Sequence, residues 1–220
     1  MVHQLSGVLS AEGVAELVEL AGNPADFVDG SRTAGRGAAA VKQNRQMPPG
    51  PRADLIMRKA ESALNAHAGF RSAALPKRII RTLVSRYEPG HSYGVHVDDA
   101  VMGASRSDLS FTLFLSDPGG YEGGELVLYE SGGSSAVKLN AGDAVLYPTG
   151  ALHEVRPVTG GHRLAVVGWV RSLVRRADQR EVLFDLAVSA QEMLDRSGKT
   201  DTYDRIAKTR ANLLRMWAED

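Results

Sequence analysis

The chain contains no cysteine among its 220 residues. Disulfides, thiolate metal sites and cysteine nucleophiles are therefore excluded. Any metal must be held by imidazole nitrogen and oxygen, and these ligands favour iron, zinc, manganese or nickel over metals that prefer sulfur.

Net charge and long apolar runs are also missing. Lys and Arg number 26, and so do Asp and Glu, so no basic field points to nucleic acid or to an anionic membrane. The start, MVHQLSGVLS, has neither the basic residues nor the apolar centre of a signal peptide. The longest apolar run, LAVVGWV at 164–170, is too short to cross a bilayer. We expect a cytoplasmic protein with no nucleic-acid or membrane partner.

An apolar content of 43% and a charged content of 24% are ordinary for a soluble globular protein. The pattern divides the chain into three parts. A helical region at 1–76 is expected to pack on a β-rich core at 77–172, and a helical subdomain follows at 173–220.

The first third is predicted to be mostly helical. Ser10 is a suitable N-cap for a helix that ends at Gly22, and a second helix is predicted over 53–68. The Gly-, Arg- and Ala-rich residues between them have no clear periodicity, so the role of 27–45 is left open.

Short β-rich runs separated by Gly-rich turns follow from Lys77 to Val170. Eight such runs are typical of a sandwich, a jelly roll or a small barrel. They are RIIRTLVSRY, SYGVHVD, LSFTLFLS, GELVLYE, AVKLN, DAVLYP, HEVRPV and HRLAVVGWV.

Two amphipathic helices are predicted at the C-terminal end, within 178–198 and 200–220. Asp178 and Glu181 resemble a capping box for the first, and Gly198 is expected to end it. We expect a helical hairpin packed on the β core, with a partner-binding helix as the alternative.

The stretch GVHVDDA at 94–100 contains a candidate metal pair. Residues i and i+2 of a strand face the same way, so His96 and Asp98 can point together while Asp99 points away. Composition alone gives about one His-x-acid pair by chance, so this pair needs further support.

His153 supplies that support, because it begins a later predicted strand that can close against the first. Two histidines and one carboxylate on one face of an ion form the facial triad of non-haem Fe(II) oxygenases, with open positions for a co-substrate. Arg163 is placed to bind the distal carboxylate of a 2-oxoacid such as 2-oxoglutarate. Tyr87 is the best aromatic candidate to hydrogen-bond the same carboxylate.

Four other histidines are expected to lie outside the metal site: His3, His67, His91 and His162. Asp143, in the turn NAGDAV, is expected to be structural.

Several segments also resemble the bacterial PKHD-type hydroxylases, which are Fe(II)/2-oxoglutarate dioxygenases related to prolyl 4-hydroxylase. The likeness covers most of the chain. It is carried by FVDGSRTAGRGAAAVKQN, RYEPGHSYGVHVDDAVMG, SFTLFLSDPGGYEGGELVL, LNAGDAVLYPTGALHEVRPVTGGHRLAVVGWVRSLVR and DQREVLFDL.

The resemblance implies iron ligands at His96, Asp98 and His153 and a 2-oxoglutarate arginine at Arg163. It implies a mostly β protein with flanking helices (α+β): a double-stranded β-helix, or jelly-roll, core with N-terminal helices and a C-terminal helical pair. The expected reaction hydroxylates an unidentified substrate with release of succinate and CO2. L-Ascorbate is implied as the reductant.

Two other function classes are compatible with the same residues. One is a cupin-like metal or small-molecule sensor without catalysis, which would not need Arg163. The other is a zinc hydrolase, which would need a separate general acid or base near the metal. The substrate, a small molecule or a peptide, is not identified by the sequence, and self-association is left open. Candidate substrate contacts lie in 31–45 and in DPGGYEGG at 117–124.

Overall fold

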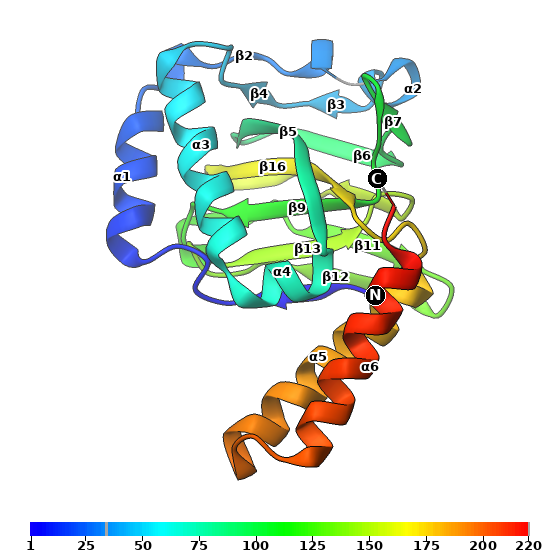
Figure 1. Cartoon of the computed structure of the whole chain (residues 1–220). Coiled ribbons are helices and arrows are strands. Elements are labelled where there is room, and N and C mark those ends of the chain that lie inside the picture. The colour runs from blue at the N-terminus through cyan, green and yellow to red at the C-terminus, as the bar shows by residue number, and fades with distance from the viewer. Residues whose placement is uncertain (34, 220) are drawn as a thin grey trace.

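Two antiparallel sheets face each other in the computed structural model, which describes residues 1–33 and 35–219 (Figure 1). The larger sheet has the order β1-β13-β9-β16-β5-β4-β2, and the smaller has the order β12-β11-β14-β6-β3. This is the jelly-roll architecture that the resemblance implied.

The strands of the larger sheet are β1 (His3–Leu5), β2 (Val28–Asp29), β4 (Arg45–Gln46), β5 (Pro76–Tyr87), β9 (Leu109–Phe114), β13 (Ala144–Pro148) and β16 (Arg163–Ser172). Those of the smaller sheet are β3 (Lys42–Gln43), β6 (Ser92–His96), β11 (Leu126–Glu130), β12 (Gly133–Val137) and β14 (Leu152–Val155). Two short pairs are β7 (Val101–Met102) with β8 (Ser105–Arg106), and β10 (Tyr121–Gly123) with β15 (Val158–Gly161).

The helices are α1 (Ala11–Ala21), α2 (Arg36–Ala39), α3 (Pro51–Ala66), α4 (Ala68–Ala74), α5 (Ala177–Ser197) and α6 (Asp201–Trp217). Three short 3-10 turns are η1 (Pro24–Asp26), η2 (Ser31–Thr33) and η3 (Pro118–Gly120). No described helix is long and apolar enough to span a membrane.

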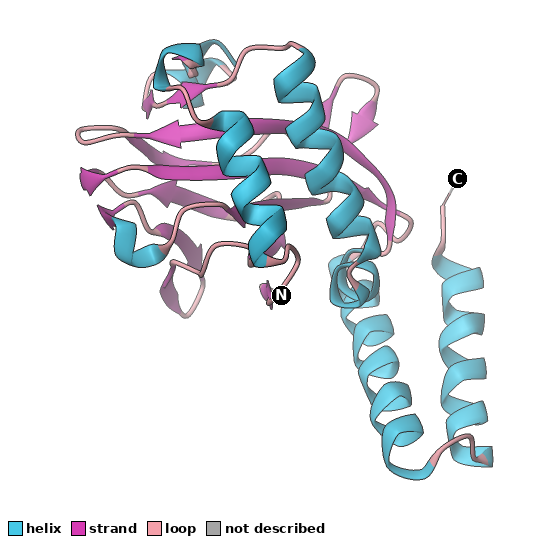
Figure 2. Ribbon diagram, turned by 90° about the vertical axis from the view of Figure 1, so that its left-hand side faces the viewer, coloured by secondary structure: helices cyan, strands magenta, loops and turns pink. Residues whose placement is uncertain are grey.

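Alternation along the strands divides the interior into two layers. Phe111 and Leu113 of β9 pack against α1 and α3, which cover the outer face of the larger sheet (Figure 2). Phe114, one residue further, joins a second apolar cluster between the two sheets. Gly168 of β16 keeps the outer layer close, because a Cβ there would lie 2.5 Å from the Phe111 ring. The polar residues of β9 thus face the space between the sheets.

Strands are present in all eight predicted runs, although β12 begins earlier than AVKLN and takes up residues expected in a turn. Ser10 caps α1, because its hydroxyl accepts a hydrogen bond from the Gly13 N–H. The second predicted helix is confirmed as α3, and a further helix, α4, follows it: the His67 imidazole accepts from the Phe70 N–H and starts α4.

The mostly helical N-terminal third needs correction. Four short strands from this region, β1 to β4, pair with the two sheets. They have two or three residues each, too short for an alternating pattern to appear in the sequence. The division of the chain at 76 and 172 stays a prediction.

The C-terminal hairpin projects from the β core (Figures 1 and 2). Only its base is packed, where Leu183 joins Leu75 and Val174, and no residue of α6 is buried among those described. The expectation of a hairpin packed on the core is therefore correct only at the base. The apolar stripes of α5 and α6 mainly face each other instead.

The start of α5 also differs from the prediction. The helix begins after Arg176, and no side chain caps it. Asp178 forms an ion pair with Arg176 at 2.6 Å instead of a capping box with Glu181. Gly198 does end the helix, with φ of +67°.

Candidate active site

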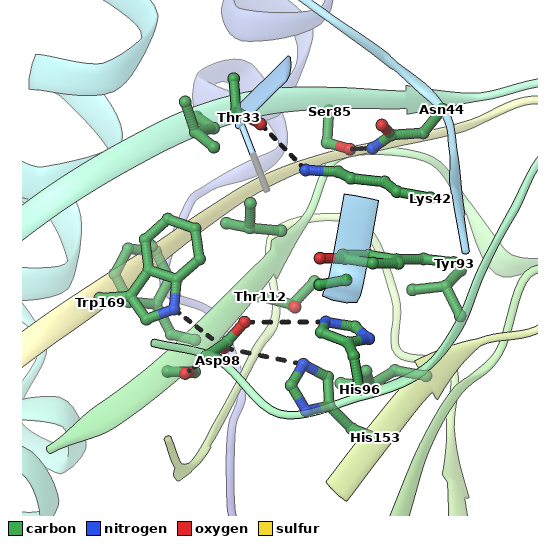
Figure 3. Close-up of a pocket in the computed structure, with 18 of the residues that line it drawn as sticks. Thr33, Lys42, Asn44, Ser85, Tyr93, His96, Asp98, Thr112, His153 and Trp169 are labelled. Carbon is green, nitrogen blue, oxygen red and sulfur yellow. Dashed lines mark hydrogen bonds and ion pairs between the residues drawn. The ribbon is translucent and has the colours of Figure 1, made fainter. Parts of the chain in front are cut away.

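Three side chains converge between the sheets: His96, Asp98 and His153, called the ligand cluster below (Figure 3). His96 ends β6 and pairs directly with His153 of β14, and Asp98 follows two residues after His96. Their ligand atoms all lie within 4.8 Å of one another. The predicted pair and the predicted third ligand are therefore brought together.

The imidazole rings are oriented by backbone carbonyls. Nδ1 of His96 donates to the Gly94 carbonyl at 2.8 Å, and Nδ1 of His153 donates to the Ala151 carbonyl at 2.9 Å. Each Nε2 therefore keeps its lone pair, and each lies 3.7 Å from a carboxylate oxygen of Asp98. This is the arrangement of two neutral imidazoles ready to bind a cation.

The electrostatic environment of His96 also favours its neutral form. Burial, and after it the neighbouring His153, lower the pKa of His96 to about 4. His96 is only 7% exposed and His153 only 4%. Neutral pH therefore leaves the His96 imidazole unprotonated, as a metal ligand must be.

Two donors from the larger sheet hold Asp98. The Ser110 hydroxyl and the Trp169 indole N–H both donate to Oδ2, at 2.7 and 2.8 Å. Neither of them contacts Oδ1 with a hydrogen bond, so that oxygen is left for a cation. These contacts were not predicted, because Ser110 on β9 and Trp169 on β16 are far from Asp98 along the chain.

Arg163 begins β16 and is only 1% exposed. Its guanidinium lies 5.4 Å from the ring of Tyr87 and 5.2 Å from that of Phe114. None of its three nitrogens has a hydrogen-bond partner among the described residues. A buried cation without a partner is costly, so this guanidinium has the properties of a carboxylate receptor awaiting its ligand.

Neighbouring residues leave space for the Arg163 side chain. Tyr87 is its cross-strand partner, and burial raises the pKa of the Tyr87 phenol, which keeps it a neutral donor. Gly124 adopts φ of +68°, and a Cβ there would lie 3.2 Å from Arg163 Cδ and 3.1 Å from the Tyr121 ring. Gly124 of the segment DPGGYEGG therefore lies against the Arg163 side chain, and the expected substrate contact of this segment stays a prediction.

One pocket connects the ligand cluster, Arg163 and Tyr87. Residues 31–46, called the N-terminal wall below, contribute six lining positions, all but the last within the predicted 31–45 segment: Thr33, Gly35, Ala38, Lys42, Asn44 and Gln46. Ala34 of the predicted 27–45 segment lies outside the described residues. The guess that 31–45 borders the substrate site is thus compatible with where this segment lies.

The remaining candidates lie apart from the cluster. His3 contacts Phe184, His67 caps α4, and His91 accepts from the Glu88 N–H. Asp99 is exposed. Asp143 accepts a hydrogen bond from the Gly7 N–H at 2.7 Å, which is the structural role expected for it.

The donor set fits a ferrous ion and a 2-oxoacid. Two neutral imidazoles and one carboxylate match a metal of intermediate softness, and the unpartnered Arg163 matches a carboxylate in the same pocket. A zinc hydrolase fits less well. Glu154, an acid adjacent to a ligand, instead accepts a hydrogen bond from Tyr129 at 2.8 Å on the strand face away from His153.

Comparison with known proteins agrees with this chemistry. The sequence model of the 2OG-Fe(II) oxygenase superfamily matches residues 82–171, and that of the PKHD-type hydroxylase C-terminal domain matches 178–219. A PKHD-type hydroxylase of Maricaulis maris (strain MCS10) is 56% identical over all of both chains, and one of Synechococcus sp. (strain JA-3-3Ab) is 48% identical over all of both.

Solved structures share the fold. A prolyl-4-hydroxylase of Pseudomonas putida matches 78% of this chain and 92% of its own, with a TM-score of 0.55 and 23% identity. A prolyl hydroxylase of Trichoplax adhaerens, in complex with a hypoxia inducible factor peptide fragment, matches 77% and 82%, with a TM-score of 0.60 and 15% identity.

Proposed function

The chain belongs to the PKHD-type hydroxylases, a family of Fe(II)- and 2-oxoglutarate-dependent dioxygenases, and we propose that His96, Asp98 and His153 hold its iron. The enzyme hydroxylates a substrate while 2-oxoglutarate is converted to succinate and CO2. Bound iron supplies the site at which O2 and 2-oxoglutarate react. The comparisons give the sensor alternative no support, because the family models and the curated relatives named above are those of oxygenases and hydroxylases.

The protein's own residues then have distinct tasks. His96 and His153 present Nε2 because their Nδ1 atoms are occupied by backbone carbonyls. Ser110 and Trp169 fix Asp98 through Oδ2. The burial of both imidazoles keeps bulk water from the ligand cluster.

Arg163 is proposed to bind the distal carboxylate of 2-oxoglutarate. The observation that carries this assignment is the fully buried guanidinium with three unpartnered nitrogens. A bidentate contact would satisfy it and fix the co-substrate in one orientation. Tyr87 is proposed as an additional hydroxyl donor to the same carboxylate, supported by its place opposite Arg163 on the neighbouring strand.

Further roles rest on the resemblance and the sequence. L-Ascorbate is proposed as the reductant that restores oxidised iron, and the cytoplasm as the compartment. The proposed substrate is a small molecule or a peptide, with no nucleic-acid or membrane partner. The zero net charge of the chain supports the exclusion of nucleic acid. Assembly with further copies of the chain stays a proposal.

The test is succinate release by the iron-loaded enzyme. Protein reconstituted with Fe(II) without oxygen, then given 2-oxoglutarate and air, is expected to form succinate even without substrate. His96→Ala is expected to abolish this turnover, whereas His162→Ala, which changes an exposed histidine, is expected to keep it. Wild-type turnover in His96→Ala would refute the ligand assignment.

A further inference from the structure

A buried lysine in the N-terminal wall has no role in the scheme above. Lys42 lies on β3, at the edge of the smaller sheet, and is only 8% exposed. It lines the same pocket as the ligand cluster and Arg163. Lysine is rarely buried to this extent without a charged partner, so its surroundings need an explanation.

The hydrogen bonds of Lys42 leave most of its ammonium unused. Nζ donates to the Thr33 hydroxyl at 3.0 Å, and that neutral group already directs its own hydrogen toward the Gly30 carbonyl and Gln46 Oε1. The ion pairs formed by the described residues do not include Lys42. An ammonium has three donors, so two remain for a ligand.

The Lys42 ammonium lies close to the place where a substrate would react. Nζ lies 5.0 Å from the centre of the Tyr93 ring, and the same ring stacks on His96 with centroids 3.5 Å apart. Figure 3 shows Lys42 on one side of Tyr93 with His96 and Asp98 on the other, so the cation borders the space next to the ligand cluster. One small molecule could therefore contact Lys42 with one group and place another group beside an iron ion in the ligand cluster.

The charge of Lys42 is only partly offset by its surroundings. Burial is the largest effect and lowers the pKa of Lys42 to about 8; Asp98 and Asp29 act in the opposite direction, and Arg81 adds to the lowering. In the assembled site the two charges of Fe(II) and the charge of Arg163 are balanced by Asp98 and the two carboxylates of 2-oxoglutarate. Lys42 is left as an additional cation, and an anion beside it would offset the desolvation.

We propose that Lys42 binds a carboxylate of the molecule that is hydroxylated. A single ammonium with two free donors can satisfy both oxygens of one carboxylate. This inference rests on the proposed function, because it assumes that iron and 2-oxoglutarate occupy the ligand cluster and Arg163. It defines the substrate class as carboxylic acids.

The first experiment uses acetate and acetamide, which match in shape and differ in charge. Wild-type protein is loaded with Zn(II), saturated with 2-oxoglutarate and labelled with ¹³C at lysine Cε; the Lys42 resonance is identified by its loss in Lys42→Met. Acetate is expected to shift this resonance saturably, and acetamide is not. Equal shifts, or no saturable shift with acetate, would overturn the proposal.

The second experiment measures acetate binding by titration calorimetry in variants. Lys42→Met is expected to weaken it at least tenfold, whereas Lys77→Met, an exposed lysine at the start of β5, is expected to leave it unchanged. Acetate that still binds Lys42→Met with wild-type affinity must use the metal, which would also overturn the proposal.

Co-substrate kinetics separate this inference from the proposed function. Lys42→Met is expected to keep the apparent KM for 2-oxoglutarate within twofold in turnover without substrate. A rise of fivefold or more would make Lys42 a co-substrate ligand and overturn its assignment to the substrate. Absence of 2-oxoglutarate turnover in the wild type would instead refute the proposed function, while the acetate experiments still report on Lys42.

Discussion

The ligand cluster with Arg163 and the N-terminal wall border one pocket but are built differently. The first group is carried by regular strands and by the turn after β6, and paired registers fix its members. The wall consists of two-residue strands and single helical turns, and it contributes Lys42. The residues proposed to bind iron and 2-oxoglutarate thus lie on or beside regular strands, and the residue proposed to bind the substrate lies in the more irregular segment.

The largest expected effect separates two neighbouring carboxylates. Asp98→Ala is expected to lose stoichiometric metal binding and all 2-oxoglutarate turnover, because a charged ligand disappears from the cluster. Asp99→Ala is the matched control, since Asp99 is exposed and outside the cluster. Metal content after dialysis and succinate release measure both. Normal metal content in Asp98→Ala would refute the assignment of the ligand cluster as the metal site.

Arg163→Met should affect binding and stability in opposite directions. Loss of two charged hydrogen bonds predicts a rise of about 100-fold in the apparent KM for 2-oxoglutarate. Loss of an unpartnered buried cation predicts a metal-free protein more stable by about 1–3 kcal/mol. Urea unfolding and initial-rate kinetics test the two effects. A destabilised variant with normal KM would mean that Arg163 is structural.

Trp169→Phe tests how firmly the larger sheet holds a ligand. The indole N–H to Asp98 is lost, but the Ser110 donor remains. Metal affinity is expected to fall by about tenfold, as is usual when such a supporting contact is removed. Competition with a chelator measures it, and Trp217→Phe in the C-terminal hairpin is the control. Unchanged affinity would show that Ser110 alone positions Asp98.

Lys42→Met completes the comparison of the two buried cations. Because the folded-state pKa is lowered from 10.5 to about 8, the charged form is disfavoured on folding at neutral pH. Removing it should raise the free energy of unfolding at pH 7 by up to about 3 kcal/mol. The nearby charges that act on it are Asp98 and Asp29, which favour the ammonium, and Arg81, which opposes it.

The pH dependence gives this prediction its sign. Above pH 8 the folded protein loses the proton first, so the advantage of Lys42→Met should shrink as the pH rises from about 8 toward 10.5. Urea unfolding of both proteins at pH 7 and pH 9.5 measures the change. An advantage that is constant with pH would show that packing, and not charge, separates the two proteins.

Sequence reasoning succeeded where the chain alternates regularly. His96, Asp98 and Arg163 lie on or beside strands long enough to show their period, and their common direction follows from it. Trp169 and Ser110 were missed although their strands were predicted. The sequence of a strand does not say which other strands lie next to it in the sheet. The register that brings their donors to Asp98 exists only in the folded protein.

The predictions for the N-terminal wall and for the C-terminal hairpin were incomplete for other reasons. The two-residue strands β3 and β4 are formed through tertiary pairing and leave no periodic signal. Lys42 was therefore not singled out within the predicted 31–45 segment. The stripes of α5 and α6 were correctly identified, but a stripe does not say whether it faces the core or its partner helix. Here it faces the partner helix.

The most direct test of the central claim compares two co-substrates that differ by one carboxylate. 2-Oxobutyrate has the metal-chelating end of 2-oxoglutarate and lacks the distal carboxylate proposed for Arg163. The account predicts that the metal-loaded wild type binds 2-oxoglutarate about 100-fold more tightly, and that Arg163→Met binds the two nearly equally. Equal binding by the wild type, or a preference that survives in Arg163→Met, would contradict it.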